Sequence, residues 1–270
     1  MKTLKANTKP INGRATIPFG SRYITRRERR GGVRLAVFDI DGTIFRSSLV
    51  IELSHALVKA GVFPFAAKKE IATEYLAWVN RQGSYEAYIN KVVKIYVKYI
   101  TGKKFIAADK IAKKVIAAQK DRVYRFTRDL ILKLKKDHHL LVAISGSPAY
   151  IVEKYAKAIG FDLFFGTELE VVNGKFTGKV ANLESAYNKA GIVKALAKKY
   201  SANLSKSLAV GDTEGDIAML KLVGRPIAFN PNAQLAKYAK KHKWKIAVER
   251  KDVIYNVKEF EILTDPNTTN

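Results

Sequence analysis

The sequence has no cysteine, and it has only two methionines and seven prolines among its 270 residues. Without cysteine the chain cannot form a disulfide, use a thiolate nucleophile or bind a metal through sulfur. No apolar run approaches the roughly 18 residues that a membrane-spanning helix needs, and residues 1–32 lack the apolar stretch of a secretory signal. These absences exclude a disulfide scaffold and an integral membrane protein, and we expect a cytoplasmic location.

Acidic residues are also scarce. The chain has 24 Asp and Glu against 49 Lys and Arg, a net charge of +25. Such a charge favours anionic ligands, namely phosphorylated metabolites, nucleic acid or an anionic membrane surface, although a general preference for lysine would produce it too. Residues 1–32 hold nine Lys and Arg and a single acid, Glu28. We predict a disordered basic arm there, either a solvated tail or a segment that contacts the phosphates of nucleic acid or lipid.

Short apolar runs that alternate with helical patterns predict the fold class. Five runs are expected to be strands: Val33–Asp39, Leu140–Ile144, Phe161–Phe165, Ser207–Val210 and Pro226–Phe229. Helical periodicity is found at Tyr150–Ile159, Gly191–Tyr200, Ile217–Leu222 and Ala233–His242. Strands that alternate with helices predict an α/β fold, a Rossmann-like parallel sheet with helices on both faces.

Two interruptions break this alternation. Asn173-Gly174, between strand-forming residues, predicts a β-hairpin. From Ile44 to about Asp137 the pattern is helical, with Ile89, Val93, Tyr96 and Ile100 on one face. We therefore predict a helical domain inserted after the first strand. The expected domains are an arm at 1–32, a core at 33–47 and 135–256, a helical insert at 48–134 and a tail at 257–270.

Polar residues follow the predicted strands at the points where the strands end. Ligands of parallel α/β folds bind beyond these carboxyl ends. Asp39 and Asp41 are two residues apart, so they lie on the same side of the chain and repel each other unless a cation or a proton is present. Gly42 permits a tight turn that brings backbone amides close to a ligand.

Asp212 and Asp216 add two more carboxylates at another strand end. Oxygen ligands without sulfur or a histidine set suit Mg²⁺. A magnesium site with a hydroxyl donor and a lysine suits a phosphoryl group, and a carboxylate can act as the nucleophile of phosphoryl transfer.

Four motifs in order resemble the haloacid dehalogenase superfamily of phosphohydrolases. Within it the chain is similar to subfamily IB, the phosphoserine-phosphatase-like branch. The resemblance extends over about residues 33–250. The motifs are Asp39-Ile40-Asp41-Gly42-Thr43 after an apolar strand, Ser145-Gly146-Ser147, Lys189 at the start of a helix, and Gly211-Asp212-Thr213-Glu214-Gly215-Asp216.

The resemblance implies a role for each matched residue. Asp39 would be the nucleophile that becomes an aspartyl-phosphate, and Asp41 the general acid and base. Mg²⁺ would be the cofactor, bound by Asp39, Asp41 through its backbone carbonyl, and Asp212, with Asp216 beside it. Substrate binding falls to Gly42, Ser145, Gly146 and Lys189. The helical insert then corresponds to the family's C1 cap, which selects the leaving group.

The insert also bears on the substrate. Close phosphoserine phosphatases carry a glutamate nine residues after the nucleophile, where this chain has Ser48, and Glu52 is the nearest downstream acid. Residues 44–137 hold 20 Lys and Arg against 8 Asp and Glu. This balance favours an anionic leaving group, such as that of a sugar, nucleotide or lipid phosphate, over the zwitterion of phosphoserine.

The sequence thus predicts a Mg²⁺-dependent phosphomonoester hydrolase that acts on a small phosphorylated metabolite. Two alternatives remain open at this point. One is a phosphotransferase that passes the phosphoryl group to an alcohol instead of water. The other belongs to a different class, a basic nucleic-acid-binding protein on an idle scaffold. The oligomeric state is not predicted.

Overall fold

The computed structural model describes residues 32–182 and 188–259, so residues 1–31 of the predicted arm and most of the predicted tail lie outside the described residues. Within them the helices are α2 (Leu49–Lys59), α3 (Phe65–Val79), α4 (Tyr85–Ile100), α5 (Phe105–Gln119), α6 (Arg125–Lys136), α7 (Ala149–Ile159), α9 (Lys189–Tyr200), α10 (Ile217–Leu220) and α11 (Ala233–Lys241). The strands are β1 (Leu35–Asp39), β2 (Leu140–Pro148), β3 (Leu163–Val172), β4 (Lys175–Asn182), β5 (Leu208–Gly211), β6 (Arg225–Phe229), β7 (Lys245–Arg250) and β8 (Val253–Val257). The predicted α/β class is confirmed.

The chain divides into two compact units. One contains the described residues of 45–123 and 143–188, and the other contains the described residues of 23–44, 124–142 and 189–270. Strand β2 contributes its first three residues to the second unit and the rest to the first. The units do not follow the boundaries drawn from the sequence, because α7, β3 and β4 group with the helical insert. The division into a core and a cap stays a prediction.

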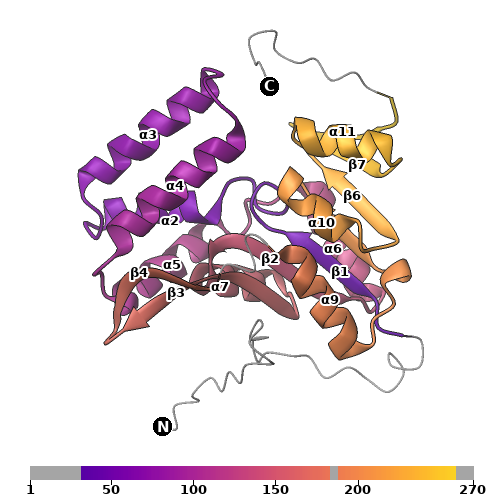
Figure 1. The fold of residues 1–270 in the computed structure, drawn as a ribbon, viewed down its shortest axis with the longest axis horizontal. Helices are drawn as coiled ribbons and strands as arrows, with labels where there is room; N and C mark the ends of the chain where they lie inside the picture. Colours follow the sequence, from indigo (N-terminus) through magenta and orange to yellow (C-terminus); the bar gives the residue numbers. More distant parts are fainter. Residues whose placement is uncertain (1–31, 183–187, 260–270) are drawn as a thin grey trace. The chain divides into compact units, whose positions relative to one another are not determined.

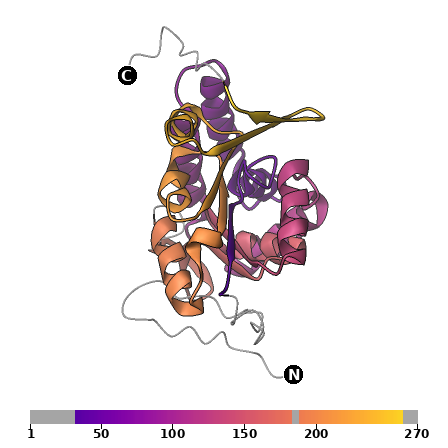
Figure 2. The same ribbon diagram turned by 90° about the vertical axis from the view of Figure 1, so that its right-hand side faces the viewer.

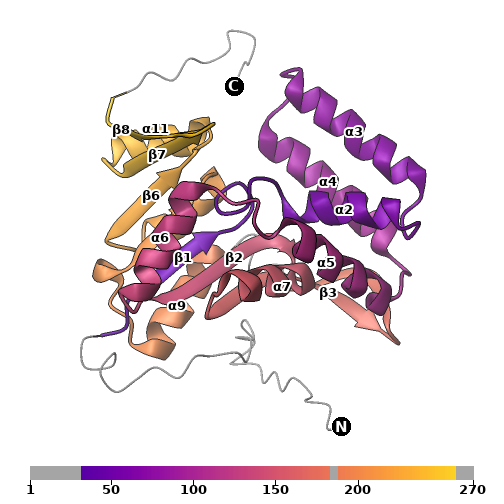
Figure 3. The same cartoon turned by 180° about the vertical axis from the view of Figure 1, so that it is seen from behind.

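The second unit is built on a mostly parallel sheet in which the strand order is β2-β1-β5-β6-β7-β8. β1 pairs with β5 in parallel through Val37 and Ala209, and only β8 runs antiparallel, beside β7 (Figure 2). Helix α6 covers one face, and α9, α10 and α11 cover the other (Figures 1 and 3). Because both faces are covered, β1 and β5 are buried along their whole length, which explains their unbroken apolar sequences.

The first unit packs helices α2 to α5 and α7 with the β3–β4 hairpin. Helices α3 and α4 lie side by side, as do α5 and α7 (Figure 3). The predicted hairpin forms at Asn173 and Gly174, whose φ angles of 49° and 73° are those of a tight two-residue turn. Helix α4 buries Tyr96 and Ile100 of the predicted face, but nearer its N-terminus Tyr88 and Val92 are buried while the predicted Ile89 and Val93 are half-buried.

Strands β7 and β8 were not predicted from the sequence. In β7 only Ile246, Ala247 and Val248 are apolar, with charged residues on either side, and β8 (Val-Ile-Tyr-Asn-Val) is a short strand whose side chains are exposed or half-buried. The predicted strands themselves are found, although β2 extends to Pro148 and β3 to Val172. Among the described helices, none has the length and apolar character required to cross a lipid bilayer.

Candidate active site

The end of strand β1 positions the first two acidic residues in the second unit. Asp39 is the last residue of β1 and is 5% exposed, because the apolar strand carries it into the sheet. Asp41 lies two residues further, in a turn closed by the backbone N–H of Ile44, which donates to the carbonyl of Ile40 at 2.9 Å. The sequence motif therefore buries one carboxylate and leaves the other partly exposed at the strand end.

Gly42 is required by the geometry of this turn. Its φ is +78°, a left-handed conformation that side chains rarely adopt. A Cβ at this position would collide with the Asp212 carboxylate. The glycine therefore allows the first and fourth motifs to approach each other, and Thr43 then donates from Oγ1 to Asp212 Oδ1 at 3.1 Å.

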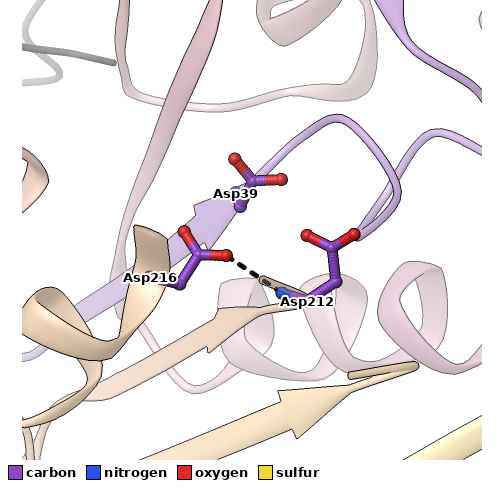
Figure 4. Close-up of side chains that lie close together, drawn as sticks. All are labelled: Asp39, Asp212 and Asp216. Carbon is purple, nitrogen blue, oxygen red and sulfur yellow. Dashed lines mark hydrogen bonds between the residues drawn. The ribbon is translucent and has the colours of Figure 1, made fainter. Parts of the chain in front are cut away.

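Strand β5 ends at Gly211 and leads into the loop that carries the other two acids. The Asp216 carboxylate is fully buried and accepts hydrogen bonds from the backbone N–H of Asp212 at 3.0 Å and of Thr213 at 3.2 Å. Asp216 thus folds the loop back on itself and fixes the direction of Asp212. Figure 4 shows the two side chains beside Asp39, with the bond from the Asp212 amide drawn.

Lys189, the first residue of α9, connects the two strand ends. Its ammonium donates to Asp39 Oδ1 at 2.6 Å and to Asp216 Oδ1 at 2.7 Å. The lysine side chain is only 9% exposed, and buried charges of this kind persist when they are paired and hydrogen-bonded. Lys189 therefore holds two of the predicted metal ligands in a fixed relation.

The electrostatics of the cluster favour an additional cation. Burial raises the pKa of Asp39 from its usual 3.8 to about 7; Lys189 opposes this, and Asp216 and Asp41 add to it. Burial and the charges of Asp39 and Asp216 raise the pKa of Asp212 well above its usual value. Burial alone would lower the pKa of Lys189, but Asp216 and Asp39 raise it, so the lysine stays charged. One positive charge thus faces three carboxyl groups.

The geometry of the three carboxylates fits a divalent cation. Oxygen atoms of Asp39, Asp212 and Asp216 lie within 4.8 Å of one another, and all three residues are buried. Mg²⁺ binds oxygen at 2.0–2.1 Å in an octahedral arrangement, so ligand oxygens on one ion are separated by about 3–4 Å. Small side-chain adjustments would bring this set onto one ion, and the all-oxygen donor set suits magnesium.

The second motif, Ser145-Gly146-Ser147, lies in the first unit. Ser145 is fully buried on β2, and its Oγ accepts from the backbone N–H of Ser147 at 2.9 Å. The carbonyl of Gly146 accepts from Thr167 Oγ1 at 2.7 Å. Ser147 Oγ accepts from the backbone N–H of Val50 at the start of α2, so this serine does not cap α7.

The second unit thus brings together Asp39, Gly42, Lys189, Asp212 and Asp216 from distant parts of the sequence. The sequence analysis did not single out Asn232, whose backbone N–H donates to the Asp212 carbonyl at 2.9 Å and whose side chain caps α11. Its only signal is the turn-forming segment Asn230-Pro231-Asn232. The catalytic, binding and metal roles of all these residues stay predictions.

Comparison with known proteins supplies the family. Residues 36–221 match the family of haloacid dehalogenase-like hydrolases. A phosphoserine phosphatase of Archaeoglobus fulgidus is 27% identical over 207 residues, which cover 76% of this chain and 55% of that protein. A phosphoserine phosphatase of Methanocaldococcus jannaschii is 27% identical over 221 residues, which cover 82% of this chain and 94% of that protein.

A solved structure gives the same result at the level of the fold. It is described as a phospho-aspartyl intermediate analogue of phosphoserine phosphatase, and it is 26% identical with a TM-score of 0.57. The alignment covers 82% of this chain and 95% of that one. The chain spans little more than half the length of the Archaeoglobus fulgidus relative.

Proposed function

Because the chain belongs to the haloacid dehalogenase-like hydrolase family, we propose that it hydrolyses a small phosphorylated metabolite with the help of Mg²⁺ and through an aspartyl-phosphate intermediate. The family match and the relatives confirm the predicted resemblance to the phosphoserine-phosphatase-like branch and the prediction of a phosphatase enzyme. The observation that carries the proposal is the buried group of Asp39, Asp212 and Asp216 joined by Lys189.

The proposed reaction proceeds in two steps. In the first, a carboxylate oxygen of Asp39 forms a bond to phosphorus, the bond from phosphorus to the leaving oxygen breaks, and Asp41 gives that oxygen a proton. In the second, Asp41 takes a proton from a water molecule whose oxygen attacks phosphorus. The bond to Asp39 then breaks, and inorganic phosphate and the free carboxylate are restored.

The cation site is assigned to Asp39, Asp212, Asp216 and the backbone carbonyl of Asp41. A magnesium ion bound there would neutralise charge on the phosphoryl oxygens. Lys189 supplies a second, permanent positive charge, since its hydrogen bonds to Asp39 and Asp216 fix the ammonium beside the nucleophile. Such preorganised charge stabilises a transition state without further rearrangement.

We assign the remaining phosphoryl contacts to Gly42, Ser145 and Gly146. The Ser145 Oγ on β2 accepts from the backbone N–H of Ser147, and a serine hydroxyl can serve as a donor as well as an acceptor. The tight turn at Gly42 presents backbone amides near Asp39. Hydroxyl and amide donors of this kind match the acceptor oxygens of a phosphoryl group.

The substrate we propose has an anionic or neutral leaving group. Glu52, the first acid after Ser48, accepts from Ser47 Oγ at 2.8 Å, from Gln119 at 3.0 Å and from Arg122 at 3.0 Å. Burial opposes ionisation of Glu52, but these donors lower its pKa. A carboxylate already occupied by three donors, within a strongly basic insert, favours a sugar, nucleotide or lipid phosphate over an ammonium-bearing substrate. The cytoplasm stays the predicted location.

The first test replaces the nucleophile. With p-nitrophenyl phosphate and Mg²⁺, Asp39→Asn should lower kcat by at least about 10³-fold, because the amide cannot form the covalent intermediate. Chelation of the metal should have a comparable effect on the unsubstituted protein. Asp252→Asn, on an exposed residue of the same unit, is the matched control and should retain full activity.

Phosphate release is then measured for a panel of phosphomonoesters that includes phosphoserine, together with phosphorylation of added alcohols. A folded, magnesium-loaded protein that hydrolyses none of them would overturn the proposal. Faster alcohol phosphorylation than phosphate release would replace hydrolysis with phosphotransfer. Phosphoserine as the preferred ester would overturn only the assignment of the leaving group.

A further inference from the structure

A cavity lies in the same compact unit as the acidic cluster, but at the amino ends of the strands instead of their carboxyl ends. It has a volume of about 640 Å³ and is bounded by helix α6, the first residues of β5, β6 and β7, and the segment that joins α11 to β7. Strands β5 to β7 are parallel, so their amino ends share one edge. Asp212 of the acidic cluster follows the carboxyl end of β5. The four residues of that strand, about 13 Å in length, separate Asp212 from the cavity.

The walls of this cavity are strongly basic. Lys133, Arg225, Lys243 and Lys245 line it together with His242, and Asp137 is the single acid. None of the four Lys and Arg side chains forms a salt bridge with any residue in the described part of the chain. Cations that converge on a concavity without carboxylate partners create a positive potential that attracts an anion.

The cavity also contains an aromatic surface. The ring of Trp244 lies 5.0 Å from Tyr238 at 56° and 6.1 Å from His242 at 41°. Both contacts are tilted, so no ring among the described residues stacks in parallel on the indole. Lys245 Nζ lies 5.4 Å from the centre of the Phe126 ring. A planar group could therefore stack on Trp244 while its charged end meets the neighbouring lysines.

We propose that this cavity binds a nucleoside phosphate, with the base against Trp244 and the phosphate held by Lys243, Lys245 and Arg225. The volume lies within the range of about 300–1,000 Å³ that is typical of small-molecule sites. An apolar floor with a few convergent charges is the usual composition of such sites. The phosphate alone would satisfy the cations but would leave the aromatic wall uncovered. This binding is separate from the proposed hydrolysis, which uses the opposite edge of the sheet.

The test uses the tryptophan as its own reporter. The chain has two tryptophans, so in the full-length Trp78→Phe variant only Trp244 fluoresces. Adenosine 5′-monophosphate is titrated in EDTA, which prevents magnesium-dependent turnover at the acidic cluster. We expect saturable quenching with a dissociation constant between about 10 µM and 1 mM, the range common for small polar ligands. Calorimetry on the unsubstituted chain repeats the measurement without any substitution.

Charge reversals identify the phosphate contact. Lys245→Glu and Lys243→Glu should each weaken binding at least about tenfold. Lys241→Glu makes the same change of charge at the exposed end of α11, outside the cavity lining, and should alter the affinity less than about twofold.

Adenosine and inorganic phosphate separate the two halves of the ligand, and both should bind more weakly than the nucleotide. Equal affinity for inorganic phosphate would overturn the stacking assignment. An equal loss of affinity in Lys241→Glu, or no saturation at 5 mM nucleotide (roughly the ceiling for a specific site), would overturn the site. Tighter binding of a short single-stranded oligonucleotide than of the mononucleotide would also overturn it, in favour of a nucleic-acid surface.

Discussion

Among single residues, burial distinguishes the few charged side chains that are enclosed and paired inside the protein from the many that lie on its surface. Lys189 is one of 49 Lys and Arg residues, and nothing in its own sequence distinguishes it from Lys194 or Lys198. Its position between the second and fourth motifs was the only basis for selecting it. The structure adds that Lys189 is buried between Asp39 and Asp216. Local sequence cannot reveal such a pairing, because the partners are 150 and 27 residues away.

His139 is a second buried titratable residue, and it leads to a prediction about acid stability. It is 1% exposed, and neither ring nitrogen has a hydrogen-bond partner among the described residues. Burial, and then the charge of Arg34, lower the pKa of His139 from its usual 6.5 to about 4. The unfolded chain therefore binds a proton at higher pH than the folded chain does. Stability contributed by the neutral ring is present above pH 6.5 and is lost as the pH falls towards 4.

The size of this effect is on the order of 3 kcal/mol over the full interval. His139→Leu should reduce the loss of stability between pH 6.5 and 4.5, because the variant has no group that titrates at this position. It should also be no less stable at pH 7, since two unpaired buried nitrogens are removed. Urea unfolding at a series of pH values measures both effects. His55→Leu, on an exposed residue of α2, should leave the pH dependence in place. An unchanged slope in His139→Leu would contradict the assignment.

At the scale of elements, helix α11 and the loop after β5 depend on one another through Asn232. The Asn232 side chain accepts from the backbone N–H of Leu235 and caps α11, while its own N–H donates to the Asp212 carbonyl. The N-terminus of α11 therefore supports the loop that carries a proposed magnesium ligand.

Asn232→Ala should lower the free energy of unfolding by about 1 kcal/mol, the usual effect of losing an N-cap. It should also weaken magnesium binding, because the support of the Asp212 loop is loosened. The measurements are chemical unfolding and calorimetric titration with Mg²⁺. Ser84→Ala removes the cap of α4 in the other unit, where Ser84 Oγ accepts from Ala87 N–H at 3.1 Å. That control should lose similar stability and keep its metal affinity; equal metal affinity in Asn232→Ala would show that the cap does not support the site.

The elements also show where sequence reasoning succeeds and where it ends. β1 and β5 are covered on both faces, so their apolar runs were sufficient to predict them. β7 has only three apolar residues between charged ones, and the apolar side chains of β8 are exposed or half-buried, so neither strand has a buried apolar run of this kind. In α4 the C-terminal half of the predicted face is buried, but in the N-terminal half tertiary packing buries Tyr88 and Val92 more fully than the predicted Ile89 and Val93. Periodicity alone cannot distinguish between two adjacent apolar faces.

For the molecule as a whole, the sequence predicted the α/β class, and the four motifs predicted which residues to consider. It did not predict the grouping into compact units, in which α7 and the β3–β4 hairpin join the helical insert. Contacts between segments far apart in the chain determine such a grouping, and these contacts leave no local pattern. The cavity at the amino ends of β5 to β7 has the same origin, since its basic residues come from three separate segments.

The distribution of charge leads to a prediction about residues 1–31. This segment carries nine of the 49 basic residues, while every residue of the proposed reaction lies between positions 39 and 216. Deletion of residues 1–31 should therefore leave kcat and KM for a phosphomonoester within about twofold of the full chain, because it removes none of the residues assigned to the reaction and attraction of substrate by net charge is screened at physiological salt. The same deletion should weaken binding to single-stranded nucleic acid and flatten its salt dependence.

Steady-state kinetics and a salt titration of binding check both parts. A folded truncation without phosphatase activity would show that the segment takes part in the reaction. If the truncated chain bound nucleic acid as tightly as the full chain, residues 1–31 would have no role in polyanion binding.

The position of Lys189 between two aspartates has a consequence for how quickly the enzyme would respond to magnesium. Lys189 already holds Asp39 and Asp216 close together, so these two carboxylates of the proposed magnesium site are in position before the ion binds. The rate of turnover would then follow the magnesium concentration of the solution directly, without a slow refolding step after the concentration changes.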